Sequence, residues 1–127
     1  MHIKRGELVA APGTPGESIL EYPTAEGQDC ESLERFKIRT LDAGAATETE
    51  VDPVRESFWM VIRGSGTVSA AAPFTSFRSS EATAQVTRGA DGEAAELGEK
   101  DLLIFEGGEP HSFEAGPDGL EFFDVAW

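Results

Sequence analysis

The stretch that decides the fold is Gly44–Gly64, with the sequence GAATETEVDPVRESFWMVIRG. Glycine stands at both ends, an acidic half follows the first glycine, and the apolar run Ser57–Ile62 precedes the last one. A second stretch, Leu102–His111 (LLIFEGGEPH), leads from an apolar run through two glycines to a proline and a histidine. Short apolar runs rich in aromatic and β-branched residues, bounded by glycine, are typical of buried β-strands.

Other short strands are expected on both sides of these stretches. Over Leu33–Leu41 the residues alternate, which places Phe36 and Ile38 on one face and the basic residues on the other. The glycines of Arg63–Gly66 are expected to stop the strand that begins at Ser57. The remaining expected elements are a hairpin partner over Thr67–Ala72, weaker strands within Phe74–Arg88, a helical turn or short strand over Glu93–Leu97, and strands at His111–Glu114 and Leu120–Trp127. Many short strands separated by Gly and Pro indicate an all-β barrel or sandwich.

The two stretches, taken together, resemble the two-motif signature of the cupin family, G-x5-H-x-H-x4-E-x6-G followed by G-x5-P-x-G-x2-H-x3-N. Gly44, Gly64 and Gly108 stand at glycine positions of that signature. The resemblance implies an all-β, cupin-like double-stranded β-helix, also called a jelly-roll barrel. It predicts one cupin-like domain over residues 1–127, with a loop-rich N-terminal arm at 1–31 and the barrel at 33–127. Within the arm, one short strand is expected around Ser18–Glu21.

In cupins, three histidines and one glutamate project into the barrel and hold a divalent metal. Of the four matching positions only His111 carries the expected residue, because Glu50, Asp52 and Ser57 stand at the other three. Metal affinity falls sharply when a ligand set is this depleted, so no metal or other cofactor is expected. If a divalent transition metal does bind, Glu50, Asp52 and His111 are its expected ligands.

The second motif departs from the family at three further positions. Lys100 stands in place of glycine, Glu106 in place of proline and Ala115 in place of asparagine. Losing the proline removes a rigid turn device, so the loop that carries Glu106 is expected to differ in shape.

The family register also predicts which side chains face the interior, because residues two apart on a strand share a face. Phe58, Met60 and Ile62 would then face outward, toward a packing sheet or a partner subunit. Trp59 would be either a stacking platform for a ligand or filling for the core. The inward residues that form the candidate ligand-binding set are Glu50, Asp52, Ser57, Trp59, His111 and Phe113.

Three functions follow from this site. The first is a binding protein that holds a small polar or sugar-like molecule in the barrel without a complete metal site. The second is a metal-dependent small-molecule enzyme (an isomerase, lyase or dioxygenase) that uses His111 with Glu50 or Asp52 as acid and base. The third is a structural or dimerisation barrel whose lumen is closed by Trp59, Phe113 and Phe122.

Composition limits the partners. The chain has 127 residues and a formal net charge of −14, from 24 acidic and 10 basic residues. Such acidity repels phosphate backbones and anionic lipids, so neither nucleic acid nor membrane is expected as a partner. The single cysteine, Cys30, cannot form an internal disulfide, and the N-terminus lacks the apolar stretch of a secretory signal. We therefore expect a cytoplasmic protein. The resemblance to cupins further implies a homodimer through the outer strand faces, and the candidate site predicts a small-molecule ligand.

Overall fold

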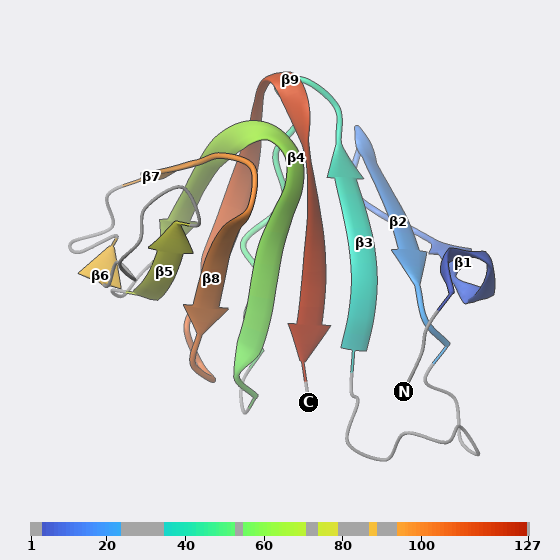
Figure 1. Ribbon diagram of the computed structural model, residues 1–127, viewed down its shortest axis with the longest axis horizontal. Helices are drawn as coiled ribbons and strands as arrows, with labels where there is room; N and C mark the ends of the chain where they lie inside the picture. The colour runs from blue at the N-terminus through green and yellow to red at the C-terminus, as the bar shows by residue number, and fades with distance from the viewer. Residues whose placement is uncertain are drawn as a thin grey trace.

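The computed structural model describes residues 4–23, 35–52, 55–70, 74–78, 87–88 and 94–126. In these ranges a short 3-10 helix, η1 (Arg5–Glu7), is followed by strands that join one antiparallel sheet (Figure 1). The strands are β1 (Val9–Ala11), β2 (Glu17–Glu21), β3 (Arg35–Leu41), β4 (Ser57–Ala70), β5 (Phe74–Arg78), β6 (Thr87–Arg88), β7 (Ala95–Leu97), β8 (Asp101–Phe105) and β9 (His111–Ala126). Their order is β1-β2-β3-β9-β4-β8-β5-β6, and β7 pairs with β4. The prediction of an all-β fold is confirmed.

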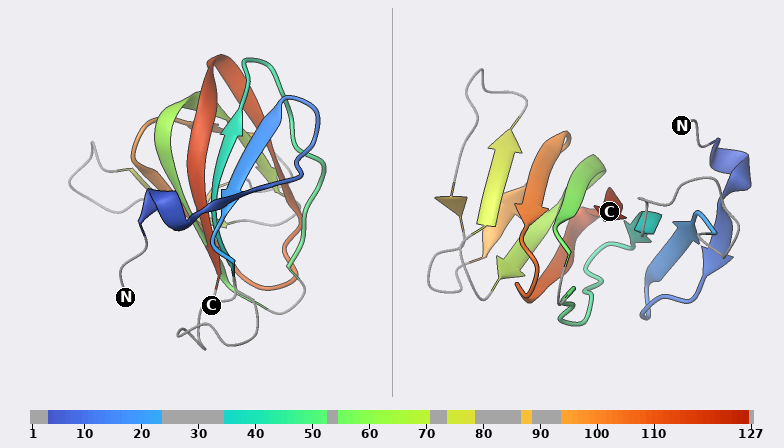
Figure 2. Two further views of the ribbon diagram at one scale, coloured as in Figure 1. Left: turned by 90° about the vertical axis from the view of Figure 1, so that its right-hand side faces the viewer. Right: turned by 90° about the horizontal axis from the view of Figure 1, so that it is seen from below.

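The sheet folds over on itself because β4 and β9 are long and bent, as the turn at the upper end of Figure 1 and the views in Figure 2 show. The last part of β9, from Leu120, pairs with both β3 and the first part of β4. Its first part, from His111 to Ala115, pairs with the end of β4. The segment that follows Gly44 runs along the other side of that first part, with bridges at Ala46–Glu114 and Glu50–His111.

Two sequence-based boundaries are wrong. The glycines between Arg63 and Gly66 do not stop the strand, and Thr67–Ala70 continues β4 rather than forming a hairpin partner. The two separate strands expected at His111–Glu114 and Leu120–Trp127 likewise form one strand, β9. Register shifts between Val61 and Arg63 and between Gly64 and Gly66 show why, since a bulge bends a strand without ending it.

Close backbone approach explains why glycine is needed at the bend. Gly64 has φ +86°, and a Cβ there would overlap the carbonyl oxygen of Gly119 on the neighbouring strand. Gly44 and Gly108 also have positive φ, at +74° and +84°. The three glycines that carried the family resemblance therefore all lie in backbone conformations that favour glycine.

The remaining expectations fall into two groups. In the N-terminal arm, β2 coincides with the strand expected at Ser18–Glu21, and β1 and β2 extend the sheet beyond β3. Ala95–Leu97 is a short strand rather than a helical turn. Residues 24–31 of the arm, residues 33 and 34 of the expected strand, and much of the stretch between residues 71 and 93 lie outside the described residues.

The alternation expected along the start of β4 is present. Ser57, Trp59 and Val61 are buried, whereas Phe58, Met60 and Ile62 are only half-buried on the outer face. Trp59 and Val61 join a hydrophobic core with aromatic residues of β8 and β9, among them Phe105, Phe113 and Phe122. None of the helical residues within the described ranges forms a helix long and apolar enough to cross a membrane.

Lys100 provides a test of the motif register. It takes a position where the cupin signature has glycine, and its φ is +66°. We predict that Lys100→Gly raises the free energy of unfolding by about 0.5–1 kcal/mol, because relief of left-handed strain outweighs the extra entropy of glycine in the unfolded chain.

Urea denaturation in 1 M NaCl, which screens the lost charge, measures this difference. The matched control is Glu99→Gly in the same turn, where φ is not positive. That control should lose stability, and equal losses in both variants would show that Lys100 carries no backbone strain.

Candidate functional site

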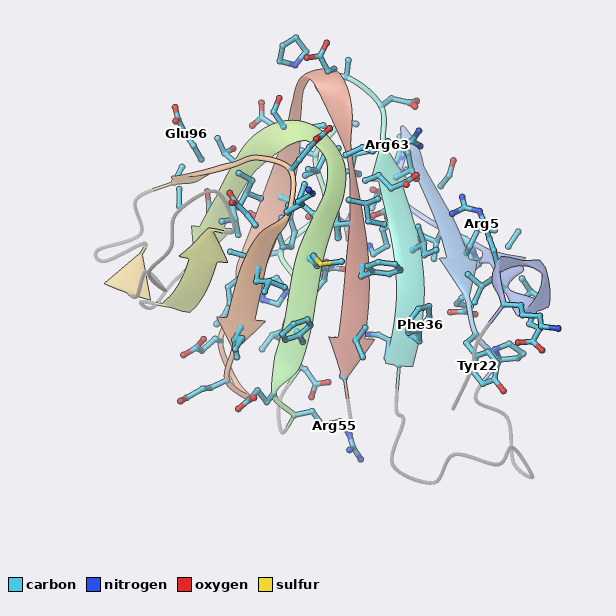
Figure 3. The ribbon with its side chains drawn as sticks, in the orientation of Figure 1. Arg5, Tyr22, Phe36, Arg55, Arg63 and Glu96 are labelled. Carbon is cyan, nitrogen blue, oxygen red and sulfur yellow. The ribbon has the colours of Figure 1, made fainter. Side chains whose placement is uncertain are left out.

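The basic face of β3 points into the mouth of the barrel. Arg35, Lys37 and Arg39 all line a cavity of about 320 Å³, whereas Phe36 and Ile38 lie on the outer face of the sheet. Figure 3 shows Phe36 on that outer face, near the lower end of β3. The polar side of this strand is therefore the interior side.

Arg39 lies at the centre of a buried ion cluster. Its side chain is only 3% exposed, and its guanidinium is 2.8 Å from Glu17, 2.8 Å from Glu50 and 3.4 Å from Asp124. Burial alone would lower the pKa of Arg39, but a hydrogen bond to Glu50 and the charges of all three carboxylates raise it. We call Arg39, Glu17, Glu50 and Asp124 the mouth cluster; it joins β2, β3, β9 and the segment after Gly44.

A second arginine extends this network toward solvent. The Nε of Arg35 donates to Asp124 at 2.8 Å, and its Nη1 lies 3.3 Å from Asp52. Asp124 therefore contacts both arginines while its own side chain is almost fully buried. Burial raises the pKa of Asp124, and the two arginines and Lys37 offset this only in part.

His111 is buried beside the mouth cluster, and only one of its two ring nitrogens has a hydrogen-bond partner among the described residues. Its Nδ1 lies 3.0 Å from the carbonyl oxygen of Glu109, which can only accept, so Nδ1 carries the hydrogen. The ring stacks on Phe105 with 4.1 Å between centroids. Nε2 is buried and has no hydrogen-bond partner within the described part of the chain.

The protonation state of His111 follows from its surroundings. Burial lowers its pKa, the Glu109 carbonyl and the charges of Glu50 and Asp124 raise it in part, and Arg39 lowers it further. The imidazole is therefore neutral near pH 7, and Nε2 presents a lone pair that can accept a hydrogen bond.

Below the mouth, aromatic rings fill the barrel. The Trp59 ring lies 4.8 Å from Phe113 and 5.3 Å from Phe122, and all three side chains are almost fully buried. The indole N–H of Trp59 donates to Ser57 Oγ at 2.9 Å. Of the two roles weighed for Trp59, its 2% exposure and these contacts favour core filling.

The structure separates the six predicted ligand-binding residues into two groups. Glu50, Asp52, Trp59 and His111 line the mouth cavity. Ser57 and Phe113 do not line it, because Ser57 accepts the hydrogen bond from Trp59 and Phe113 packs in the aromatic filling. Whether any of these residues binds a ligand stays a prediction.

Sequence reasoning missed five residues that line the cavity, Arg35, Lys37, Arg39, Val51 and Asp124. One signal was present, since three of the chain's ten basic residues alternate along one face of a single strand. Asp124 gave no comparable signal, because an isolated acidic residue in an apolar strand is uninformative in a chain with 24 of them.

Three of the four donors at the cupin ligand positions already have partners within the protein. Glu50 is paired with Arg39, Asp52 is paired with Arg35, and Ser57 accepts from Trp59. Within the described ranges no group of three or more His, Cys, Asp or Glu side chains is placed to hold a metal ion. The expectation that no metal binds is not tested by this geometry alone and stays a prediction.

Comparison with known proteins supports the fold. No family model and no curated protein matches the sequence. Among solved structures, salicylate 1,2-dioxygenase from Pseudaminobacter salicylatoxidans has a TM-score of 0.64 and 24% identity over 91% of this chain, which spans only 28% of that protein. The same enzyme as an adduct with gentisate gives the same TM-score, with 26% of its chain covered. KdgF from Halomonas sp. has a TM-score of 0.65 and 15% identity, with 97% of this chain and 89% of that chain covered.

These similarities confirm the fold expected from the glycine frame. The chain has the all-β jelly-roll fold of the cupins. It spans about a quarter of the length of the salicylate dioxygenase, and identities below 25% carry the fold and not the activity.

The buried, neutral His111 makes stability depend on pH. Because its pKa is lower in the folded than in the unfolded protein, the stability that it contributes is present above about pH 6.5 and is lost as the pH falls below that value. We predict that the urea midpoint of the wild type falls more between pH 7.5 and pH 5.5 than that of His111→Gln.

Comparing the two proteins cancels the part of the pH response that comes from the other charges. The charged groups facing His111 (Glu50, Asp124 and Arg39) are the same in both. Parallel pH profiles would contradict the inferred neutral state of His111.

Proposed function

We propose that this chain binds a small, neutral, polyhydroxylated molecule in the mouth of its barrel, without a metal. The observation that carries the proposal is the Nε2 atom of His111. His111 lines the mouth cavity, and its Nε2 is buried and lacks a hydrogen-bond partner among the described residues. A buried polar atom without a partner costs about 1–3 kcal/mol, and a ligand that donates a hydrogen bond to it would recover that energy.

The balance of charge around the cavity favours a neutral ligand. Three cations, Arg35, Lys37 and Arg39, face three carboxylates, Glu50, Asp52 and Asp124. Hydroxyl groups both donate and accept hydrogen bonds, so a sugar or polyol can use donors and acceptors that alternate over a short distance. A ligand with a large net charge would meet groups of its own sign.

Size and shape agree with a ligand of about one ring. The cavity volume of about 320 Å³ lies at the small end of the range of about 300–1,000 Å³ typical of ligand sites. The aromatic filling below Trp59 limits how deep a ligand can reach, so binding would take place at the mouth rather than within the lumen.

The other two functions have less support. A metal-dependent enzyme needs free donors, and two of its three expected ligands, Glu50 and Asp52, are paired with arginines. The aromatic filling is what a purely structural barrel would have, but such a barrel has no need for a polar mouth with an unpaired imidazole nitrogen. The similar dioxygenase is known with gentisate, an aromatic hydroxy acid, which makes hydroxy acids the alternative ligand class.

Ligand-observed NMR and calorimetry test the proposed binding, with glucose and inositol as neutral probes and glucuronate and salicylate as anionic ones. We expect a neutral probe to bind and His111→Ala to weaken its binding at least tenfold, since about 1.4 kcal/mol corresponds to a factor of ten.

The control is Ser112→Ala, because this neighbour of His111 points away from the cavity and should leave affinity unchanged. Preference for the anionic probes would shift the proposal to hydroxy acids. If none of the four probes binds, or if His111→Ala leaves the affinity unchanged, the proposal is contradicted and a purely structural barrel is favoured.

We also propose that the chain forms a homodimer through the outer face of its sheet. Phe58 and Met60 of β4 lie in register with Ile104 and Leu102 of β8 on one side, and with Val125 and Phe123 of β9 on the other. All six are half-buried in the single chain. A continuous apolar surface on a protein of net charge −14 is where two copies can approach with the least charge repulsion.

Sedimentation velocity tests the dimer. We expect the wild type to sediment at twice the chain mass of 13.6 kDa, and Met60→Glu to sediment as a monomer because it places two like charges in the interface. Ser112→Glu, on the part of β9 away from this face, should remain dimeric. A monomeric wild type at high concentration would rule out this interface.

A further inference from the structure

We propose that Arg39 is the resident cation of this barrel, and that it balances the carboxylates of the mouth cluster in place of a divalent metal. With Arg39 present the cluster excludes metal, and without it the cluster binds a divalent cation. This inference does not depend on whether the cavity binds a polyol.

The partners of Arg39 come from three separate parts of the chain. Its Nε and Nη2 lie 2.9 and 2.8 Å from Glu17 on β2, its Nη1 lies 2.8 Å from Glu50, and the same Nη1 lies 3.4 Å from Asp124 on β9. One guanidinium thus faces three carboxylates. A fixed positive charge at the junction of these groups does what a bound cation would do, and it repels a second cation from the same place.

Glu17 depends most on that charge, because it is removed from water and pairs with Arg39; Asp124 is also removed from water but pairs with Arg35 as well, and Glu50 is 39% exposed. The side chains of Glu17 and Asp124 are 2% and 3% exposed. Breaking a buried ion pair by removing one partner leaves an uncompensated charge, which either takes up a proton or recruits a new cation. Loss of Arg39 would leave Glu17 without an ion-pair partner within the described residues.

A neutral imidazole also lines this cavity. Glu50 and Asp124 line it together with His111, whose Nε2 is buried and unpaired within the described residues while its Nδ1 is held by the Glu109 carbonyl. Carboxylates with one imidazole form a donor set suited to Mn²⁺. Without the Arg39 guanidinium, the site would gain both space for a cation and excess negative charge to attract one.

Arg39→Ala titrated with Mn²⁺ tests the inference. Free Mn²⁺ gives a six-line EPR signal that is lost on binding, and thermal unfolding provides an independent readout. We expect the wild type to leave the signal intact at 1 mM Mn²⁺. We expect Arg39→Ala to bind one Mn²⁺ per chain at least tenfold more tightly than the wild type, with a melting temperature about 5 °C higher in Mn²⁺ than in EDTA.

Three further variants identify the cause of binding. Arg39→Lys retains a cation and should exclude Mn²⁺ like the wild type. Arg39→Ala combined with Glu50→Gln should lose most of the gained affinity. Arg63→Ala is the control, because Arg63 also pairs with a buried carboxylate, that of Glu121 at 3.0 Å. Figure 3 shows Arg63 near the upper end of the barrel, whereas Arg55 and Phe36 lie toward the lower end. Arg63→Ala leaves one carboxylate and no cluster, so it should not respond to Mn²⁺.

Several results would overturn the proposal. They are stoichiometric Mn²⁺ in the wild type, Mn²⁺ binding by Arg39→Lys equal to that of Arg39→Ala, and a folded Arg39→Ala that shows neither signal loss nor a thermal shift. If Arg39→Ala is unfolded in EDTA, circular dichroism decides. Folding restored by Mn²⁺ supports the proposal, and an unfolded chain in both conditions overturns it.

Discussion

The contacts of Arg39 with Glu17, Glu50 and Asp124 are the interaction on which the arrangement of this barrel mouth depends. They join four segments that no local rule would bring together. Glu17 and Asp124 are removed from water, so neither can exchange its ion pair for hydration without a large desolvation penalty, whereas the side chain of Glu50 is 39% exposed. Such a cluster contributes little net stability over a well-packed apolar core, but it fixes which side chains face one another.

That constraint also explains which face of β3 points inward. Alternation in the sequence correctly separates Phe36 and Ile38 from the three basic residues, but alternation alone does not say which set is interior. The usual rule is that the apolar face of a strand points inward. That rule holds when one face of the strand is exposed to solvent and the other face packs on a core. In this barrel the outer face is apolar as well, and the basic residues are neutralised by carboxylates far away in the sequence. Arg39 and Asp124, for example, are 85 residues apart.

The fold was predictable from the sequence because it depends on local backbone requirements. Gly44, Gly64 and Gly108 each have positive φ, and even the exception, Lys100, takes the conformation of the glycine that it replaces. Strand boundaries were less predictable, because a glycine that bends a strand and a glycine that ends one look the same in the sequence. Within the candidate site, Glu50, Asp52, Trp59 and His111, which the family register directed inward, line one cavity, and their role as a ligand site stays a prediction. Their charged partners were not, because the choice of partner is made by tertiary packing.

Arg39 marks the level at which the interior changes from apolar to polar. Its guanidinium lies 5.5 Å from the ring centroids of both Trp59 and Phe122, a distance at which a cation is attracted to an aromatic face. On one side of it the rings fill the lumen and leave no room for a ligand, and on the other the side chains are polar and paired. His111 also lines the cavity, and its ring stacks on Phe105. A ligand of the kind we propose would therefore be held at the mouth, where it would compete with ion pairs that are already complete. A neutral hydrogen-bonding molecule can enter without breaking them, whereas a bare cation would have to displace Arg39.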